Sequence, residues 1–203
     1  MSANTSSAVM QQRHEPRDSL EDFPTPPWAT RAFCEKIFIG GSLSCREPAA
    51  NRGHMVKPLR EYFSEVLASD VHDYGFGFEV RDYLFPEPLD EVDWTITNPP
   101  FRLAEEFILK ALVESRMGVA VIVRSAFLES KGRHERLFKP YPPSHIFQFC
   151  ERVVMHKGKL SPNGSTATSY SWVVWDHMRV SNSTTFDWIK PCRKRLEREG
   201  DYT

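Results

Sequence analysis

Asp93-Trp94-Thr95-Ile96-Thr97-Asn98-Pro99-Pro100-Phe101 is an apolar strand pattern that stops abruptly at a polar residue, two prolines and an aromatic ring. Trp94 to Thr97 are β-branched or aromatic, which is typical of a buried strand. Pro99 and Pro100 have no backbone N–H to donate, and they hold the residues before them out of the helical region. The stretch therefore predicts a strand that ends in a short rigid turn.

Apolar residues recur at helical spacing after this turn, at Leu103, Phe107, Ile108, Ala111 and Leu112. The two prolines thus connect a predicted strand with a predicted helix. In an open α/β sheet, ligands bind at the carboxyl ends of the strands, where turns of this kind lie. The turn is therefore the first candidate for a functional site.

The turn carries groups suited to a reaction on a planar amine. The exocyclic amine of adenine is a poor nucleophile because its lone pair is delocalised into the ring. The side-chain carbonyl of Asn98 and the main-chain carbonyl of Pro99 can both accept its protons, which favours a tetrahedral nitrogen with a free lone pair. Phe101 can stack on the base during this step.

The tetrad Asn98-Pro99-Pro100-Phe101 resembles motif IV of the S-adenosylmethionine-dependent methyltransferases that act on amino groups, and its Asn form is similar to the N6-adenine DNA methyltransferases. The resemblance implies a Rossmann-like class I methyltransferase fold: an α/β sheet of seven mostly parallel strands, the last one antiparallel. It also implies S-adenosylmethionine as cofactor, DNA as partner and catalytic roles for all four residues, with no metal. The small size resembles that of orphan adenine methyltransferases of bacteriophages and prophages.

Further family motifs precede the tetrad in order. Thr25-Pro26 before a helix resembles motif X, and a helix N-terminus favours an anion such as the methionine carboxylate of the cofactor. Residues 47–53 resemble motif I in its Glu-Pro-Ala-x-Gly-x-Gly form. Asn51 takes the first glycine position there, and Asn is the residue next best able to adopt a left-handed conformation.

Two acidic positions complete the predicted cofactor site. Asp70 closes the second strand, 23 positions beyond Glu47, and resembles the motif II carboxylate that binds a ribose diol. Asp82 and Tyr83 resemble motif III, which contacts the adenine ring. The predicted cofactor-binding residues are Thr25, Glu47, Ala49, Asn51, Gly53, Asp70, Asp82, Tyr83 and Asn98.

Charge is divided unevenly along the chain. Residues 1–123 carry 12 Lys and Arg against 19 Asp and Glu, a balance of −7, whereas residues 124–159 carry 8 against 3, a balance of +5. An anionic substrate would meet the second half of the fold, although a solvated basic face would give the same count. The predicted substrate-binding residues are Arg124, Lys131, Arg133, His156, Lys157 and Lys159.

Periodicity predicts the remaining elements. We expect helices over about residues 28–38, 54–63 and 131–138, and strands over residues 42–46, 66–69, 79–80, 118–123, 144–150 and 170–175. Residues 151–169 form a long polar connection that resembles motif VIII, on the substrate side. We expect residues 1–20 to be disordered, residues 21–178 to form the methyltransferase domain, and residues 179–203 to form a tail packed by Trp188.

Composition narrows the class of protein. Charged residues make up 26% and no apolar run reaches the length of a membrane span, so we expect a cytoplasmic protein that does not bind membranes. The four cysteines are scattered without a CxxC pair, which favours reduced and mostly buried thiols over a zinc site or a disulfide framework.

Alternatives of two kinds remain open. An Asn-Pro-Pro-Phe turn also serves methylation of RNA bases and of protein glutamine amides, although the basic region favours a nucleic acid. A non-catalytic nucleic-acid-binding protein with a decayed cofactor site is the other alternative. Asn51, and the small room left for a separate target-recognition domain, motivate that second alternative.

Overall fold

A computed structural model describes residues 20–37, 42–180 and 183–202. The helices are α1 (Pro27–Ile37), α2 (Val56–Leu59), α3 (Ala104–Glu114), α4 (Lys131–Arg133) and α5 (Arg193–Leu196). The strands are β1 (Ser44–Glu47), β2 (Glu65–Asp70), β3 (Glu79–Val80), β4 (Val92–Thr97), β5 (Ser115–Arg124), β6 (His145–Phe149), β7 (Tyr170–Asp176) and β8 (Thr185–Ile189). A 3₁₀ turn follows β5, and a π-helix over His134–Phe138 continues α4.

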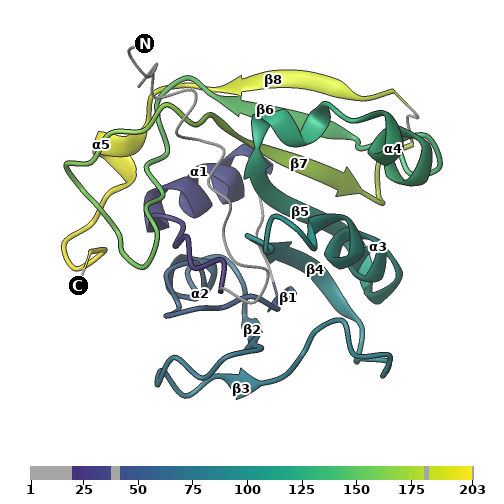
Figure 1. The fold of residues 1–203 in the computed structure, drawn as a ribbon, viewed down its shortest axis with the longest axis horizontal. Coiled ribbons are helices and arrows are strands. Elements are labelled where there is room, and N and C mark those ends of the chain that lie inside the picture. The colour runs from purple at the N-terminus through teal and green to yellow at the C-terminus, as the bar shows by residue number, and fades with distance from the viewer. Residues whose placement is uncertain (1–19, 38–41, 181–182, 203) are drawn as a thin grey trace, which may run out of the picture.

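The strands form one sheet in the order β3-β2-β1-β4-β5-β7-β6-β8 (Figure 1). The strands from β3 to β5 pair in parallel, and β7 runs antiparallel to both β5 and β6. The predicted α/β sheet with an antiparallel seventh strand is therefore confirmed. Its strand count is corrected from seven to eight in the described part of the chain, because β8 pairs in parallel with β6.

The sheet has a buried core on each face. Alternate residues of β5 point to opposite faces: Ala120 and Ile122 join a cluster with α1, whereas Val119, Val121 and Val123 join a cluster with α3. Figure 1 accordingly shows α1 and α2 on one side of the central strands and α3 on the other. Burial on both faces explains why β5 reads as a continuous apolar run.

Close contact between β4 and β5 requires a glycine. The backbone of Gly118 pairs with Trp94, and a Cβ atom at this position would lie 2.6 Å from the Trp94 ring and 2.7 Å from the Trp175 carbonyl oxygen. No side chain fits in this space. Gly118 therefore allows Trp94 to cross the face of the next strand and to fill the core beneath α1.

Two local predictions are wrong. The expected helix over residues 54–63 is reduced to α2, because Pro58 lacks the N–H that a regular helix needs at its position, and turns replace the rest. The four thiols are free, but only Cys34 and Cys45 are buried; Cys192 is half-buried and Cys150 is exposed. Cys150 lies just beyond the end of β6, where its side chain leaves the core.

The C-terminal residues join the domain rather than only touching it. Ile189 of β8 and Leu196 of α5 are buried, whereas Trp188 is 54% exposed, so the prediction that Trp188 packs this segment is wrong. Trp188 precedes Ile189 in a strand and points away from the face that Ile189 covers. The predicted disordered tail falls almost wholly on residues 1–19, outside the described residues. In the part described, no helix is long and apolar enough to span a membrane.

Candidate functional site

A cavity of about 210 Å³ opens at the carboxyl ends of β1, β2 and β4, beside the start of α1. Most of the residues predicted to bind the cofactor line it: Thr25, Ala49, Asn51, Asp70, Asp82, Tyr83 and Asn98. Pro100 of the predicted catalytic turn lines it too. The cavity thus brings together residues from five separate stretches of the sequence, although their roles as ligands stay predictions.

Glu47 lies beneath the cavity rather than in its wall. It ends β1 and is fully buried, with Oε1 accepting hydrogen bonds from the Thr97 hydroxyl at 2.6 Å and from the Ala49 N–H at 3.0 Å. Its Oε2 is buried without a hydrogen-bond partner. Burial raises the pKa of the Glu47 carboxyl to about 8. This side chain therefore ties the loop after β1 to the end of β4.

Asn51 meets the conformational demand of the glycine position that it replaces. Its φ is +50°, in the left-handed region. Its N–H donates to Asp70 Oδ2 at 2.9 Å, and its side-chain Nδ2 donates to Asp22 Oδ1 at 2.7 Å. Gly53 does not line the cavity, but its φ is +83° and a Cβ there would lie 2.8 Å from the Phe78 ring. Asn51 thus adopts the left-handed conformation that favours glycine and adds a side-chain hydrogen bond to Asp22.

The carboxylates at the ends of β2 and β3 differ in their surroundings. Asp70 accepts the N–H groups of Asn51 and His72 and is half-buried, so burial raises its pKa. Asp82 is exposed and accepts the N–H of Leu84 at 2.9 Å. Tyr83 beside it is fully buried, with its ring centroid 5.0 Å from that of Phe107. Asp70 is therefore fixed across two loops, whereas Asp82 stands at the edge of the cavity.

Thr25 supplies an unpaired oxygen at the opposite wall. It lies two residues before α1 and is 2% exposed, and its hydroxyl oxygen has no hydrogen-bond partner among the described residues. The first residue of α1, Pro27, has no N–H, and the Ala29 N–H donates to the Pro26 carbonyl oxygen at 2.9 Å, so α1 contributes chiefly the positive end of its dipole. The start of α1 and the Thr25 hydroxyl can together hold a negatively charged group.

The catalytic turn presents one free acceptor. Asn98 Nδ2 donates to the Phe23 carbonyl oxygen at 2.8 Å and lies 3.9 Å from Met155 Sδ. Asn98 Oδ1 is buried and has no hydrogen-bond partner in the part of the chain that the structure describes. The Leu103 N–H donates to the Pro100 carbonyl oxygen at 2.9 Å, so the turn leads directly into α3. The amide is therefore oriented with its oxygen left to accept a hydrogen bond.

Phe101 lies next to the cavity in a cluster of planar groups. Its ring centroid is 5.7 Å from that of Phe23 and 6.4 Å from that of Tyr170. The Arg124 guanidinium carbon lies 4.3 Å from the centre of the Phe101 ring. Arg124, predicted from the end of β5, is thus brought to the catalytic turn, and a planar cation covers Phe101.

The other predicted substrate-binding residues are less closely gathered. Arg133 packs on the Phe127 ring at 3.8 Å and donates to the Phe127 carbonyl oxygen. Both ring nitrogens of His156 bond within the loop 151–169, to Ser161 Oγ and to the Ser165 carbonyl oxygen, each at 3.0 Å. His156 and Arg133 therefore hold local structure. Lys131, Lys157 and Lys159 are exposed.

Sequence reasoning missed the residues that precede Thr25. Leu20, Glu21, Phe23 and Pro24 line the cavity, as do His54, Met55 and Tyr74. Glu21 and Asp22 are acidic neighbours in a stretch without periodicity. In the structure, Glu21 forms an ion pair with Arg102 and Asp22 forms one with Arg52, which places both beside the cavity. The acidic pair just ahead of the Pro-rich entry to α1 was the available signal.

Comparison with solved structures places this architecture among methyltransferase folds. A modification subunit of a candidate type I restriction enzyme from Vibrio vulnificus YJ016 is similar with a TM-score of 0.61 and 18% identity, over 97% of this chain and 51% of that one. A type I restriction-modification methyltransferase subunit from Streptococcus thermophilus has a TM-score of 0.63 and 11% identity, and the match covers 91% of this chain and 50% of that one. A candidate RNA methyltransferase from Pyrococcus horikoshii has a TM-score of 0.57 and 18% identity, and the match covers 84% of this chain and 96% of that one.

The TM-scores of these three structures show a shared fold, and at 11–18% sequence identity they show the fold alone. The chain spans about half the length of the two restriction-modification subunits, so their whole activities do not transfer to it directly. Neither a protein-family model nor a curated protein sequence matches the chain. The Rossmann-like methyltransferase architecture predicted from the sequence is confirmed by these structural likenesses.

Proposed function

We propose that this protein transfers a methyl group from S-adenosylmethionine to the N6 amino group of adenine in DNA. The observation that carries the proposal is Asn98 Oδ1, a buried acceptor without a partner, whose amide orientation is held by the Phe23 carbonyl. Such an acceptor suits a proton of an exocyclic amine. The shared fold with restriction-modification methyltransferase subunits supports methyl transfer as the reaction class.

The oxygen acceptors around the cavity fit the proposed cofactor. The Thr25 hydroxyl and the start of α1 would hold its carboxylate, and Asp70 would accept hydrogen bonds from its ribose hydroxyls. Asp82 and Tyr83 would contact its adenine. S-adenosylmethionine supplies a methyl group that is already activated on a sulfonium. The chain therefore needs chiefly to align the two reactants and to exclude water.

On the substrate side, the turn would act on a base that has left the stack. Duplex DNA must deliver adenine by flipping it out of the helix. Asn98 Oδ1 and the Pro99 carbonyl would accept protons of its amino group. The Arg124 guanidinium now lies 4.3 Å from the centre of Phe101, so a base that stacks on that face must displace it. Lys131, Lys157 and Lys159 would contact phosphates.

RNA is the second candidate substrate. This chain covers 96% of the candidate RNA methyltransferase from Pyrococcus horikoshii, compared with about half of each restriction-modification subunit. The described fold and the Pyrococcus horikoshii protein are thus similar in extent. The Asn-Pro-Pro-Phe chemistry is the same for both substrates, because it acts on the exocyclic amine and not on the sugar.

Methyl transfer from labelled S-adenosylmethionine to duplex DNA, single-stranded DNA, RNA and cell-extract protein would test the proposal. Mass spectrometry of the digested products identifies the modified group. N6-methyladenine in DNA is the expected result, whereas label in RNA or in glutamine side chains would change the substrate and keep the chemistry. If no substrate is labelled and equilibrium titration shows no S-adenosylmethionine binding at millimolar concentration, the proposed enzyme activity is wrong.

A further inference from the structure

Residues 21–23, here called the strap, lie at the cavity and contact three other segments of the chain that contain predicted site residues. The two acidic side chains of the strap are nearly buried: that of Glu21 is 10% exposed and that of Asp22 is 12% exposed. Carboxylates are rarely buried unless they are paired. Their partners therefore show what the strap holds.

Glu21 binds the catalytic turn. Its carboxylate accepts the backbone N–H of Phe101 and, at 2.6 Å, the Nε–H of Arg102. The next contact comes from the strap's own backbone, because the Phe23 carbonyl oxygen accepts Asn98 Nδ2 at 2.8 Å. Residues on both sides of Pro99-Pro100 are thus fixed by the same short segment.

Asp22 binds the loop after β1 and the loop 151–169. Its carboxylate accepts Asn51 Nδ2 at 2.7 Å and pairs with Arg52 Nη1 at 2.9 Å. Its carbonyl oxygen accepts the Gly158 N–H at 2.8 Å. Asn51, which departs from the glycine of the related motif, is therefore part of the strap's anchorage.

We infer that Glu21 and Asp22 are positioning residues, which act through the Phe23 carbonyl to set the Asn98 amide and which join the cofactor loop to the catalytic turn. An amide can rotate to exchange its oxygen and nitrogen, and the rotamer held by the Phe23 carbonyl is the one that leaves the oxygen as an unbonded acceptor. Glu21 serves the catalytic turn, and Asp22 serves the cofactor loop. This inference rests on the proposed function.

The two ends of the strap predict different kinetic effects. Glu21→Gln should lower kcat about tenfold or more, the scale of a charge-assisted hydrogen bond, and leave the Kd for S-adenosylmethionine within about threefold. Asp22→Asn should instead raise that Kd about tenfold, because the loop of Asn51 and Arg52 loses its anchor. Glu65→Gln, an exposed carboxylate at the start of β2, is the matched control.

Nuclear magnetic resonance supplies a test that does not depend on activity. The Phe101 and Gly158 amide protons and the Asn98 side-chain NH₂ should exchange with solvent at least about tenfold faster in Glu21→Gln,Asp22→Asn than in Glu65→Gln, because both amide side chains lack the charge and one of the two acceptor oxygens that anchor the strap. Asn98→Ala assigns the side-chain signal. Thermal melting of each variant checks that the fold is retained.

The outcomes separate the strap from the proposed function. Equal exchange rates in the double variant and the control would overturn the positioning role of the strap. A kcat for Glu21→Gln equal to that of Glu65→Gln would overturn it too. If the wild-type protein transfers no methyl group, the proposed function fails. The exchange rates then still show whether residues 21–23 anchor these three segments.

Discussion

The Asn98 amide has two ends with different surroundings. Its nitrogen is hydrogen-bonded to Phe23, and its oxygen is buried without a partner among the described residues. An unpaired buried acceptor is costly in a folded protein, and in the proposed function the amino group of the substrate would pair with it. We expect Asn98→Ala to abolish methyl transfer and to leave the affinity for S-adenosylmethionine within severalfold, measured by transfer assay and by titration. Comparable activity in this variant would remove Asn98 from the mechanism.

Glu47 predicts a dependence of stability on pH. Burial raises the pKa of its carboxyl from 4.5 to about 8, so between these values the folded state binds one proton more than the unfolded state. Stability should therefore fall as the pH rises through this window, by up to about 1.4 kcal/mol per pH unit. The amide side chain in Glu47→Gln does not titrate, so this variant should not show the fall in stability with rising pH.

Denaturant unfolding of the ligand-free protein at several pH values measures this effect. The stability of Glu47→Gln relative to wild type should increase from pH 5 to pH 8, and then remain constant. Glu65→Gln, at an exposed position, controls for the general effect of removing a carboxylate. Parallel pH profiles for Glu47→Gln and wild type would show that the carboxyl titrates alike in both states.

Elements differ in how well the sequence predicts them. The strands β4, β5 and β7 agree with prediction within a few residues, because their apolar runs are ended by prolines or polar residues. The prediction missed β8, although Thr185, Phe186, Asp187 and Trp188 alternate polar and apolar residues, because this alternation is short and four of the five residues of the strand are exposed. Its place in the sheet depends on backbone pairing with β6, which no side-chain pattern records.

The candidate site likewise contains residues that the sequence predicts and residues that it does not. Residues in motifs, such as Asp70 and Asn98, were predicted to lie together and do line one cavity. Glu21 and Asp22 were not predicted, because the hydrogen-bond partners of their side chains are 29 to 81 positions away in the chain. Such long-range hydrogen bonds follow from the tertiary structure and leave no local signal.

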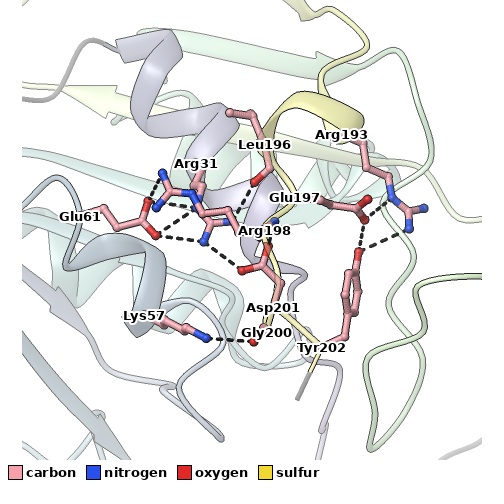
Figure 2. A network of polar contacts seen from close by, with 10 residues as sticks. All are labelled: Arg31, Lys57, Glu61, Arg193, Leu196, Glu197, Arg198, Gly200, Asp201 and Tyr202. Atoms are coloured by element: carbon pink, nitrogen blue, oxygen red, sulfur yellow. Dashed lines mark hydrogen bonds and ion pairs between the residues drawn. The ribbon is translucent and has the colours of Figure 1, made fainter.

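The C-terminal segment is tied to α1 by a buried charge network. Arg31 of α1 is 1% exposed and binds Glu61, the Leu196 carbonyl oxygen and Asp201 (Figure 2). The Lys57 ammonium donates to the Gly200 carbonyl oxygen at 2.9 Å. The C-terminal segment therefore holds both α1 and the region of α2, which flank the cavity.

Removing Asp201 should destabilise the protein. Asp201→Asn leaves the buried Arg31 with one carboxylate, and we expect the free energy of unfolding to fall by roughly 2–4 kcal/mol. Asp187→Asn is the control, because its pair with Lys36 is exposed to solvent and should contribute much less to the free energy of unfolding than the buried network does. Urea unfolding measures both. Equal losses in the two variants would show that the buried network adds nothing beyond a surface pair.

At the scale of the whole molecule, the acidic part of the chain forms the cavity, and the basic part follows it in the sequence. The acidic first part, residues 1–123 with a balance of −7, supplies nearly all of the cavity wall. The basic part, residues 124–159 with a balance of +5, begins at Arg124 beside Phe101 and ends in the loop that the strap contacts through Gly158. A polyanion that approaches the catalytic turn would thus meet the basic part.

This arrangement predicts how DNA binding depends on salt. Lysines that contact phosphates release counterions, so each one removed should lower the slope of log K against log salt by about one. We expect this of Lys131→Ala and Lys159→Ala, measured by titration of fluorescent DNA at several salt concentrations. Arg60→Ala removes an exposed cation from the acidic part and should leave the slope unchanged. If all three variants behave alike, net charge and not a defined basic surface governs binding, and the loop 151–169 would have no specific place on the DNA backbone.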